Sequence, residues 1–214
     1  MLKVPPAPEP PTFDANVRKE GERAIKEMVG EGAARRGRPR TNFGTRDAIP
    51  SEKFTDYWTR ALGDLKTAYN YICAYSCFRI HDVTGDATVD HFIPKEWRTV
   101  YEWSNYRLAC SLMNSRKDTH RDVLDPFLIQ DNWFQLELVG FQVIPGRGLE
   151  ETTRLAVQQT IDRLKLRDAV LCKAREKDAT AYWDKKISLE TLLEESPFVA
   201  RELRRQGRLN PEDR

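Results

Sequence analysis

Residues 89–118, VDHFIPKEWRTVYEWSNYRLACSLMNSRKD, carry the pattern on which the fold prediction depends. Asp90 and His91 stand together at the end of a short β-prone run, and Pro94 closes that run. Asn105 follows after ten intervening residues, and Asn114 lies nine positions further on. The complete string reads D-H-x-x-P-(x10)-N-x-x-L-x-C-x-x-x-N-x-x-K. Each of these residues has an ordinary structural explanation when taken alone, but the joint pattern is specific.

This pattern resembles the HNH endonuclease motif of the ββα-metal nuclease superfamily. Asn114 stands in place of the last histidine, a variant also found in the HNH domains of RNA-guided CRISPR nucleases. The resemblance is tight over residues 73–118 and looser to about residue 130. It implies a small ββα-metal core in which residues 106–109 form the second strand and a short helix begins near Ser111. It also implies an endonuclease that hydrolyses DNA phosphodiester bonds with the help of a metal ion.

The residue types in the motif suit that chemistry. An imidazole that titrates near neutrality can take a proton from water, so His91 is the candidate general base. Asp90 and Asn114 offer a carboxylate and an amide oxygen, the ligands that hard cations prefer, so we expect one Mg²⁺ or Mn²⁺. Adjacent strand residues point to opposite sides, so Asp90 can face the metal while His91 faces the attacking water. The resemblance implies that Asn105 orients the loop that presents His91, and Asp118 is a candidate additional metal ligand.

Basic residues gather in two places that could contact a nucleic acid. Residues 33–46 hold five arginines and no acidic residue, and their glycine and proline content predicts a loop. Phosphate neutralisation needs such charges, although a merely solvated loop is the alternative interpretation. The candidate nucleic-acid-binding residues are Arg35, Arg36, Arg38 and Arg40 in this loop, and Arg107, Arg116 and Lys117 around the motif. Trp97 and Trp103, between the motif halves, are expected to pack beneath a loop rather than stack on bases.

The cysteines depart from the family pattern. Many HNH proteins carry two C-x-x-C pairs that bind a structural zinc ion. Here Ser76 stands three residues after Cys73, and Met113 stands three after Cys110, so two of the four ligands are missing. A structural Zn²⁺ is therefore not expected, and Cys73 and Cys110 should form a small buried knuckle instead. Four cysteines are too few for a disulfide scaffold, which favours reduced thiols in a cytoplasmic protein.

Helical patterns dominate both ends of the chain, which predicts the α+β class. The first 14 residues hold five prolines and should form an extended strap over the core. We expect helices over residues 17–28, 51–72 and most of 150–214, β-prone runs at 77–80 and 87–93, and a hairpin within 134–144. These elements predict an N-terminal arm with helices (1–72), an HNH core (73–130), and a hairpin with C-terminal helices (131–214), packed as a single unit.

The overall composition excludes several classes of protein. The chain has 35 Lys and Arg against 33 Asp and Glu, a net charge of +2, which argues against a histone-like binder and an acidic solvating chain. No apolar run approaches the length of a membrane span, and the N-terminus does not read as a signal peptide, so no membrane partner is expected. No DNA-reading module is recognisable, so any sequence specificity would come from a partner or from DNA shape.

Two functions remain open at this point. The first is a metal-dependent endonuclease acting on double-stranded DNA, as the effector of a bacterial anti-phage or DNA-processing system in which a sensor or ATPase subunit controls cleavage. The second is a non-catalytic nucleic-acid-binding or assembly subunit built on an HNH scaffold. The intact set of Asp90, His91, Asn105 and Asn114 favours the first, because decay of function usually removes a ligand or the base.

Overall fold

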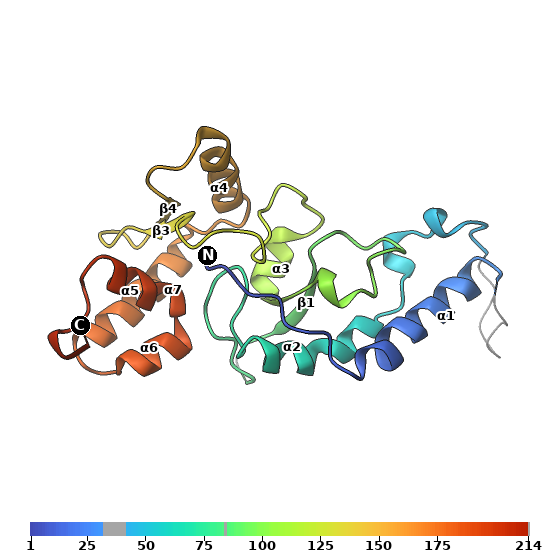
Figure 1. Cartoon of the computed structure of the whole chain (residues 1–214), viewed down its shortest axis with the longest axis horizontal. Helices are drawn as coiled ribbons and strands as arrows, with labels where there is room; N and C mark the ends of the chain where they lie inside the picture. The colour runs from blue at the N-terminus through green and yellow to red at the C-terminus, as the bar shows by residue number, and fades with distance from the viewer. Residues whose placement is uncertain (32–41, 84, 214) are drawn as a thin grey trace.

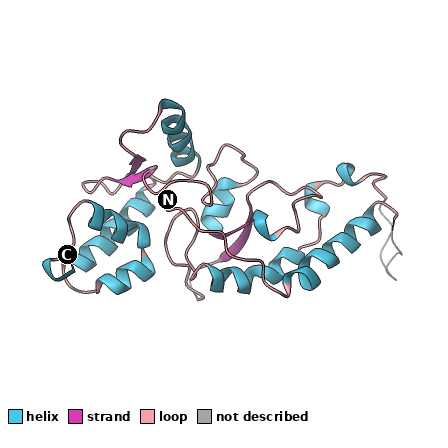
Figure 2. Ribbon diagram, viewed as in Figure 1, coloured by secondary structure: helices cyan, strands magenta, loops and turns pink. Residues whose placement is uncertain are grey.

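The computed structural model describes residues 1–31, 42–83 and 85–213 (Figure 1). Its helices are α1 (Lys19–Met28), α2 (Leu62–Ala68), α3 (Ser111–Lys117), α4 (Glu151–Arg163), α5 (Ala169–Trp183), α6 (Leu189–Glu195) and α7 (Pro197–Arg205). Its strands are β1 (Ala87–His91), β2 (Tyr106–Cys110), β3 (Phe134–Leu136) and β4 (Val143–Pro145). Figure 2 shows helices outweighing two small antiparallel strand pairs, so the α+β prediction is confirmed. None of the described helices is long and apolar enough to cross a membrane.

Strands β1 and β2 pair in the centre of the molecule and position the motif. Val89 lies opposite Leu108, and Asp90 lies opposite Arg107. Helix α3 follows β2 directly, and α2 and α3 both contact the two strands, with α3 above and α2 below them in Figure 1. The end of β1, which carries Asp90 and His91, is therefore enclosed by helices.

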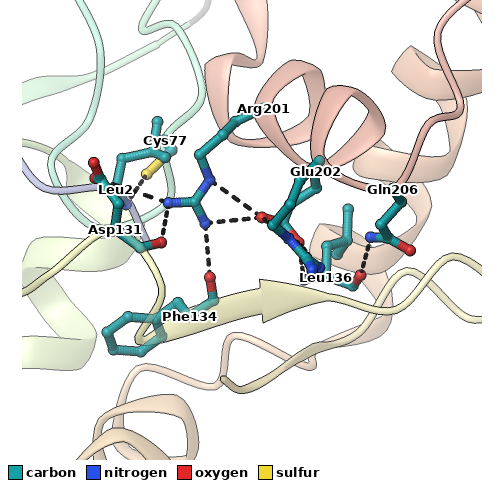
Figure 3. Close-up of polar contacts among 9 residues, drawn as sticks. Leu2, Cys77, Asp131, Phe134, Leu136, Arg201, Glu202 and Gln206 are labelled. Carbon is teal, nitrogen blue, oxygen red and sulfur yellow. Dashed lines mark hydrogen bonds and ion pairs between the residues drawn. The ribbon is translucent and has the colours of Figure 1, made fainter. Parts of the chain in front are cut away.

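The second strand pair packs with the C-terminal helices. Strands β3 and β4 are antiparallel, and α7 packs against β3 while α5 contacts α6 and α7. In the close-up of Figure 3, Arg201 of α7 donates hydrogen bonds to the carbonyls of Asp131 and Phe134. The neighbouring Glu202 is fully buried and accepts a hydrogen bond of 2.9 Å from the Leu136 amide. Side chains of α7 thus form hydrogen bonds with the backbone of β3 at both of its ends, Phe134 and Leu136.

The N-terminal arm forms the expected strap and joins distant parts of the chain. The Leu2 amide donates to the Cys77 sulfur at 3.3 Å, and the Val4 amide donates to the Pro126 carbonyl at 2.9 Å. Further along, the Ala7 carbonyl accepts from the Trp103 indole at 2.9 Å. Figure 1 shows the arm leaving the centre of the molecule and running past β1 toward α1. The strap therefore connects the segments on both sides of the β1–β2 pair, at Cys77, Trp103 and Pro126.

Several predicted elements are confirmed with small changes. The first helix begins with a π-helical turn, Asp14–Arg18, and continues as α1. The predicted hairpin is β3–β4. Asp168 caps α5 by accepting from the Val170 amide at 2.8 Å, and Ser188 caps α6. Both caps satisfy amides that the first turn of a helix leaves without partners.

Two predicted elements are wrong. Residues 51–72 do not form one helix but two 3₁₀ turns followed by the short α2. The Thr55 carbonyl accepts a hydrogen bond of 2.9 Å from the Tyr101 hydroxyl, and Asn70 and Tyr71 adopt positive φ angles after α2 ends. Residues 77–80 form no strand, because only Arg79 pairs there, in an isolated bridge with Ile72. Tertiary contacts override the local pattern in both places.

Two helical glycines give opposite expectations for stability. At Gly63 in α2, nothing lies within 4 Å of the position that a Cβ atom would occupy. At Gly21 in α1, that position lies only 2.1 Å from Cδ2 of the buried Tyr101 ring. Gly63→Ala should raise the free energy of unfolding by about 1 kcal/mol, the difference in helix propensity. Gly21→Ala should lower it by about 1–3 kcal/mol, because the ring must move. Urea unfolding measures both, and equal effects would contradict this packing.

Candidate active site

A pocket of about 410 Å³ opens beside the end of β1. Four of the residues predicted for the site line it: Asp90 and His91 from β1, Asn114 from α3, and Asp118 directly after α3. Asn105, the fifth residue, does not line the pocket. The structure therefore brings the general-base candidate and the metal-ligand candidates to one cavity.

His91 is held in a single tautomer within an aromatic enclosure. Its Nε2 lies 3.0 Å from the Val100 carbonyl, and its ring makes edge contacts with Trp58 and Tyr106. A carbonyl only accepts hydrogen bonds, so the proton of the neutral ring sits on Nε2 and the lone pair on Nδ1. Within the described part of the chain, no group donates a hydrogen bond to Nδ1. Nδ1 thus remains a free acceptor on a residue that lines the pocket.

Burial controls the protonation of His91. The side chain is 7% exposed, and burial lowers its pKa to about 4, although the hydrogen bond to Val100 acts in the opposite direction. The positive charges of Lys95 and Lys117 lower this pKa further. At neutral pH the imidazole is therefore uncharged and able to accept a proton.

Asp90 is buried and held by two side chains. It is 2% exposed, its Oδ2 accepts from the Tyr75 hydroxyl at 2.5 Å, and its Oδ1 lies 3.5 Å from Lys117 Nζ. Burial raises the pKa of Asp90, and the nearby Lys117 charge opposes this rise. Sequence reasoning missed Tyr75, because nothing in the motif spacing connects residue 75 with residue 90. Tyr75 and Lys117 together fix the direction of the carboxylate.

Asn105 holds the loop between β1 and β2. Its Oδ1 accepts from the Ile93 amide at 2.7 Å, and its Nδ2 donates to the carbonyls of Ile93 at 3.0 Å and Thr99 at 3.2 Å. Thr99 directly precedes Val100, whose carbonyl accepts the hydrogen bond from His91 Nε2. Asn105 therefore acts on the imidazole through the loop and does not face the pocket itself.

The basic residues around the motif require a correction. Lys117 is fully buried, and its ammonium donates to the carbonyls of His91 and Phe92, both at 2.7 Å. Arg107 is 3% exposed and forms a two-pronged ion pair with Asp125. Neither side chain presents its charge to solvent, so the expectation that they bind nucleic acid is wrong for this fold.

The remaining predicted nucleic-acid contacts divide into two groups. Arg116 also turns inward, where it pairs with Asp168 at 2.7 Å and donates to the carbonyls of Leu164 and Lys165 at 3.2 Å. Arg116 is nevertheless partly exposed, so its contact with nucleic acid stays a prediction. The loop arginines, Arg35, Arg36, Arg38 and Arg40, lie outside the described residues.

The oxygen atoms at the pocket fit a hard divalent cation. Asp90, Asn114 and Asp118 offer two carboxylates and an amide oxygen. Among the described residues, no group of three or more His, Cys, Asp and Glu side chains is placed to hold a metal. An ion here would therefore need Asn114, water and substrate oxygens as further ligands. This donor set suits Mg²⁺ or Mn²⁺, which accept oxygen ligands and retain water.

The predicted cysteine knuckle lies behind this site. Cys73 and Met113 are fully buried, and the Cys73 sulfur accepts a hydrogen bond of 3.4 Å from the Cys110 amide. All four cysteines are free thiols. The knuckle connects the segment before β1 with the junction of β2 and α3; the burial of Cys73 is confirmed, whereas Cys110 is only partly buried.

The His91 pKa predicts a pH dependence of stability in metal-free protein. The folded-state pKa of about 4 lies below the ordinary value of 6.5. Between these values the unfolded chain binds a proton that the folded chain does not, so stability falls as the pH drops from 6.5 to 4. Denaturant unfolding in EDTA should show that this loss, about 3 kcal/mol, is absent in His91→Gln. Equal slopes in wild type and His91→Gln would contradict a buried neutral His91.

No protein-family model matches this sequence, and no curated protein is significantly similar to it. The resemblance to HNH nucleases therefore rests on the motif residues themselves. The geometry at the end of β1 is the evidence that bears on what these residues do.

Proposed function

We propose that the chain is a metal-dependent endonuclease that hydrolyses DNA phosphodiester bonds, with β1, β2 and α3 as its ββα-metal core. One observation carries the proposal. A neutral His91, with its proton on Nε2 and its lone pair on Nδ1, shares a pocket with Asp90 and Asn114. A fixed base next to oxygen ligands is what hydrolysis of a phosphodiester by water requires.

His91 acts as the general base in this proposal. Nδ1 removes a proton from a water molecule, and the water oxygen attacks the phosphorus atom. The bond from phosphorus to the 3′ oxygen then breaks, which leaves a 5′-phosphate and a 3′-hydroxyl that takes its proton from solvent. The Val100 carbonyl keeps its hydrogen bond with Nε2–H throughout, so the ring does not need to rotate when it becomes charged.

Asp90 and Asn114 would hold the metal ion, with Asp118 as a further candidate. When bound, the divalent cation supplies positive charge that stabilises the phosphoryl oxygens and the leaving oxygen. Tyr75 and Lys117 position the Asp90 carboxylate, and the Asp90 backbone is fixed in β1 opposite Arg107. The site thus needs little rearrangement to bind a cation.

The first test compares plasmid cleavage by wild-type protein and His91→Ala in Mg²⁺ or Mn²⁺. Loss of the general base should slow cleavage by about 10²–10⁴-fold. His81→Ala changes a histidine that pairs with Glu195 away from the pocket and should cleave as fast as wild type. Equal rates for wild type and His91→Ala would refute the mechanism. If wild type also fails to cut when its genomic partner, a sensor or ATPase subunit, is added, the non-catalytic binding subunit becomes the better explanation.

The second test concerns the metal. EDTA should abolish cleavage, and excess Mg²⁺ should restore it. Asn114→Ala removes a ligand, so half-maximal cleavage should require about tenfold or more additional Mg²⁺. Asn16→Ala removes an exposed amide in the π-helical turn and serves as the matched control. An unchanged Mg²⁺ requirement in Asn114→Ala would contradict its role as a ligand.

A further inference from the structure

A second pocket, of about 470 Å³, lies between α1 and the loop that joins β1 to β2. We call it the Trp97 pocket. Four cationic side chains line it against two carboxylates, those of Glu22 and Glu102. The cations are Arg18, Lys26, Arg46 and Arg98. Outside the lining, Glu31 pairs with Arg46 and Asp47 pairs with Arg98, so an anionic ligand would compete with these carboxylates for the two guanidinium groups.

The indole of Trp97 organises two of these cations. The Arg98 guanidinium lies 4.4 Å from the centre of the indole ring system, and the Arg46 guanidinium lies 5.4 Å from it. Asp47 accepts a hydrogen bond of 2.7 Å from Trp97 Nε1, which fixes the plane of the indole. Guanidinium groups held against an aromatic face lose less conformational freedom when they bind an anion. Trp97 therefore packs against the core with one part of its ring system, as expected, and also supports two surface arginines.

Arg18 is held in ion pairs with three carboxylates, those of Glu9, Asp14 and Glu102, whereas the other three cations of the Trp97 pocket remain available to a ligand. Arg98 is 60% exposed and pairs only with the exposed Asp47, at 3.3 Å. Arg46 pairs with Glu31, whose side chain is 53% exposed. Lys26 has no ion-pair partner in the part of the chain that the structure describes. Exposed pairs of this kind contribute little to stability, so a phosphate can replace the carboxylates at low cost.

The Trp97 pocket is next to the candidate active site. Trp58 lines the active-site pocket and Tyr101 lines the Trp97 pocket, and their rings stack with centroids 6.2 Å apart. The same loop contributes Lys95 to the first pocket and Trp97 to the second. A strand that leaves the active site along this loop would therefore meet Arg98 and Arg46 next.

We propose that the Trp97 pocket binds the backbone phosphates of the DNA strand next to the scissile phosphate, through Arg46 and Arg98. This inference rests on the proposed function, which supplies the DNA. Arg107, Arg116 and Lys117 form ion pairs within the fold, so the DNA phosphates need further cationic partners. Arg46 and Arg98 would provide them. Non-specific phosphate binding here holds the substrate across the active site without reading its sequence.

The test measures binding of a labelled 20-base-pair duplex by fluorescence anisotropy at several salt concentrations. EDTA and a His91→Ala background prevent cleavage. Each phosphate contact contributes about 0.9 to the slope of log K against log salt, so the double variant Arg46→Ala/Arg98→Ala should lower that slope by roughly 2. Arg154→Ala, which removes a half-exposed arginine paired with Glu151 on α4, should leave the slope unchanged. Arg98→Lys keeps the charge and should also preserve the slope.

The outcomes separate this inference from the proposed function. The inference is overturned if the double variant shows the same slope of log K against log salt as Arg154→Ala. It is also overturned if wild-type protein does not bind the duplex at low salt. Neither result affects the cleavage tests. A lowered slope together with a wild-type protein that never cuts DNA would support the Trp97 pocket and reject the endonuclease. Thermal unfolding of each variant shows whether a smaller salt dependence of binding results from a variant that is no longer folded.

Discussion

The buried ammonium of Lys117 is the contact on which the candidate site depends. Lys117 is the last residue of α3, and its Nζ donates to two successive carbonyls at the end of β1, those of His91 and Phe92. The same atom lies 3.5 Å from Oδ1 of Asp90. A fully buried cation is costly unless its protons find acceptors and its charge is balanced. The Asp118 carbonyl accepts the third hydrogen bond, at 3.4 Å, and the Asp90 carboxylate balances the charge. Through these contacts the Lys117 ammonium connects α3, which carries Asn114, to β1, which carries Asp90 and His91.

A second set of contacts sets the orientation of His91. Asn105 holds both ends of a short stretch of the loop, at Ile93 and Thr99. The next carbonyl, that of Val100, accepts from His91 and also from the Tyr106 hydroxyl at 2.8 Å. A carbonyl oxygen with two donors has both lone pairs occupied, so its position is well determined. The loop thus determines the tautomer of a residue nine positions away.

The β-prone pattern before His91 predicts β1, and the resemblance to HNH nucleases implies the helix near Ser111 that brings Asn114 to the pocket. The sequence reading treats Lys117 and Arg107 as nucleic-acid contacts around the motif, whereas the structure buries both side chains. Charged residues are seldom buried without partners. The burial of these two side chains depends on partners such as Asp90 and Asp125, which no periodicity identifies. Contacts between distant residues also explain two other failures of the sequence analysis. The hydrogen bond from Tyr75 to Asp90 was missed, and the helix predicted over residues 51–72 is broken where the Tyr101 hydroxyl bonds to the Thr55 carbonyl.

The energetic cost of this polar centre is what the proposed function would explain. Of the eleven buried polar or charged residues among those the structure describes, five lie within residues 90–117: Asp90, His91, Asn105, Arg107 and Lys117. Well-packed apolar residues often stabilise a fold as much as a buried ion pair does, or more. A scaffold that only bound nucleic acid through its surface would gain nothing from a buried carboxylate next to a neutral imidazole. Under the proposed function, such a pair would hold a base and a cation at fixed positions around a reacting phosphate, which would account for both polar groups inside the fold.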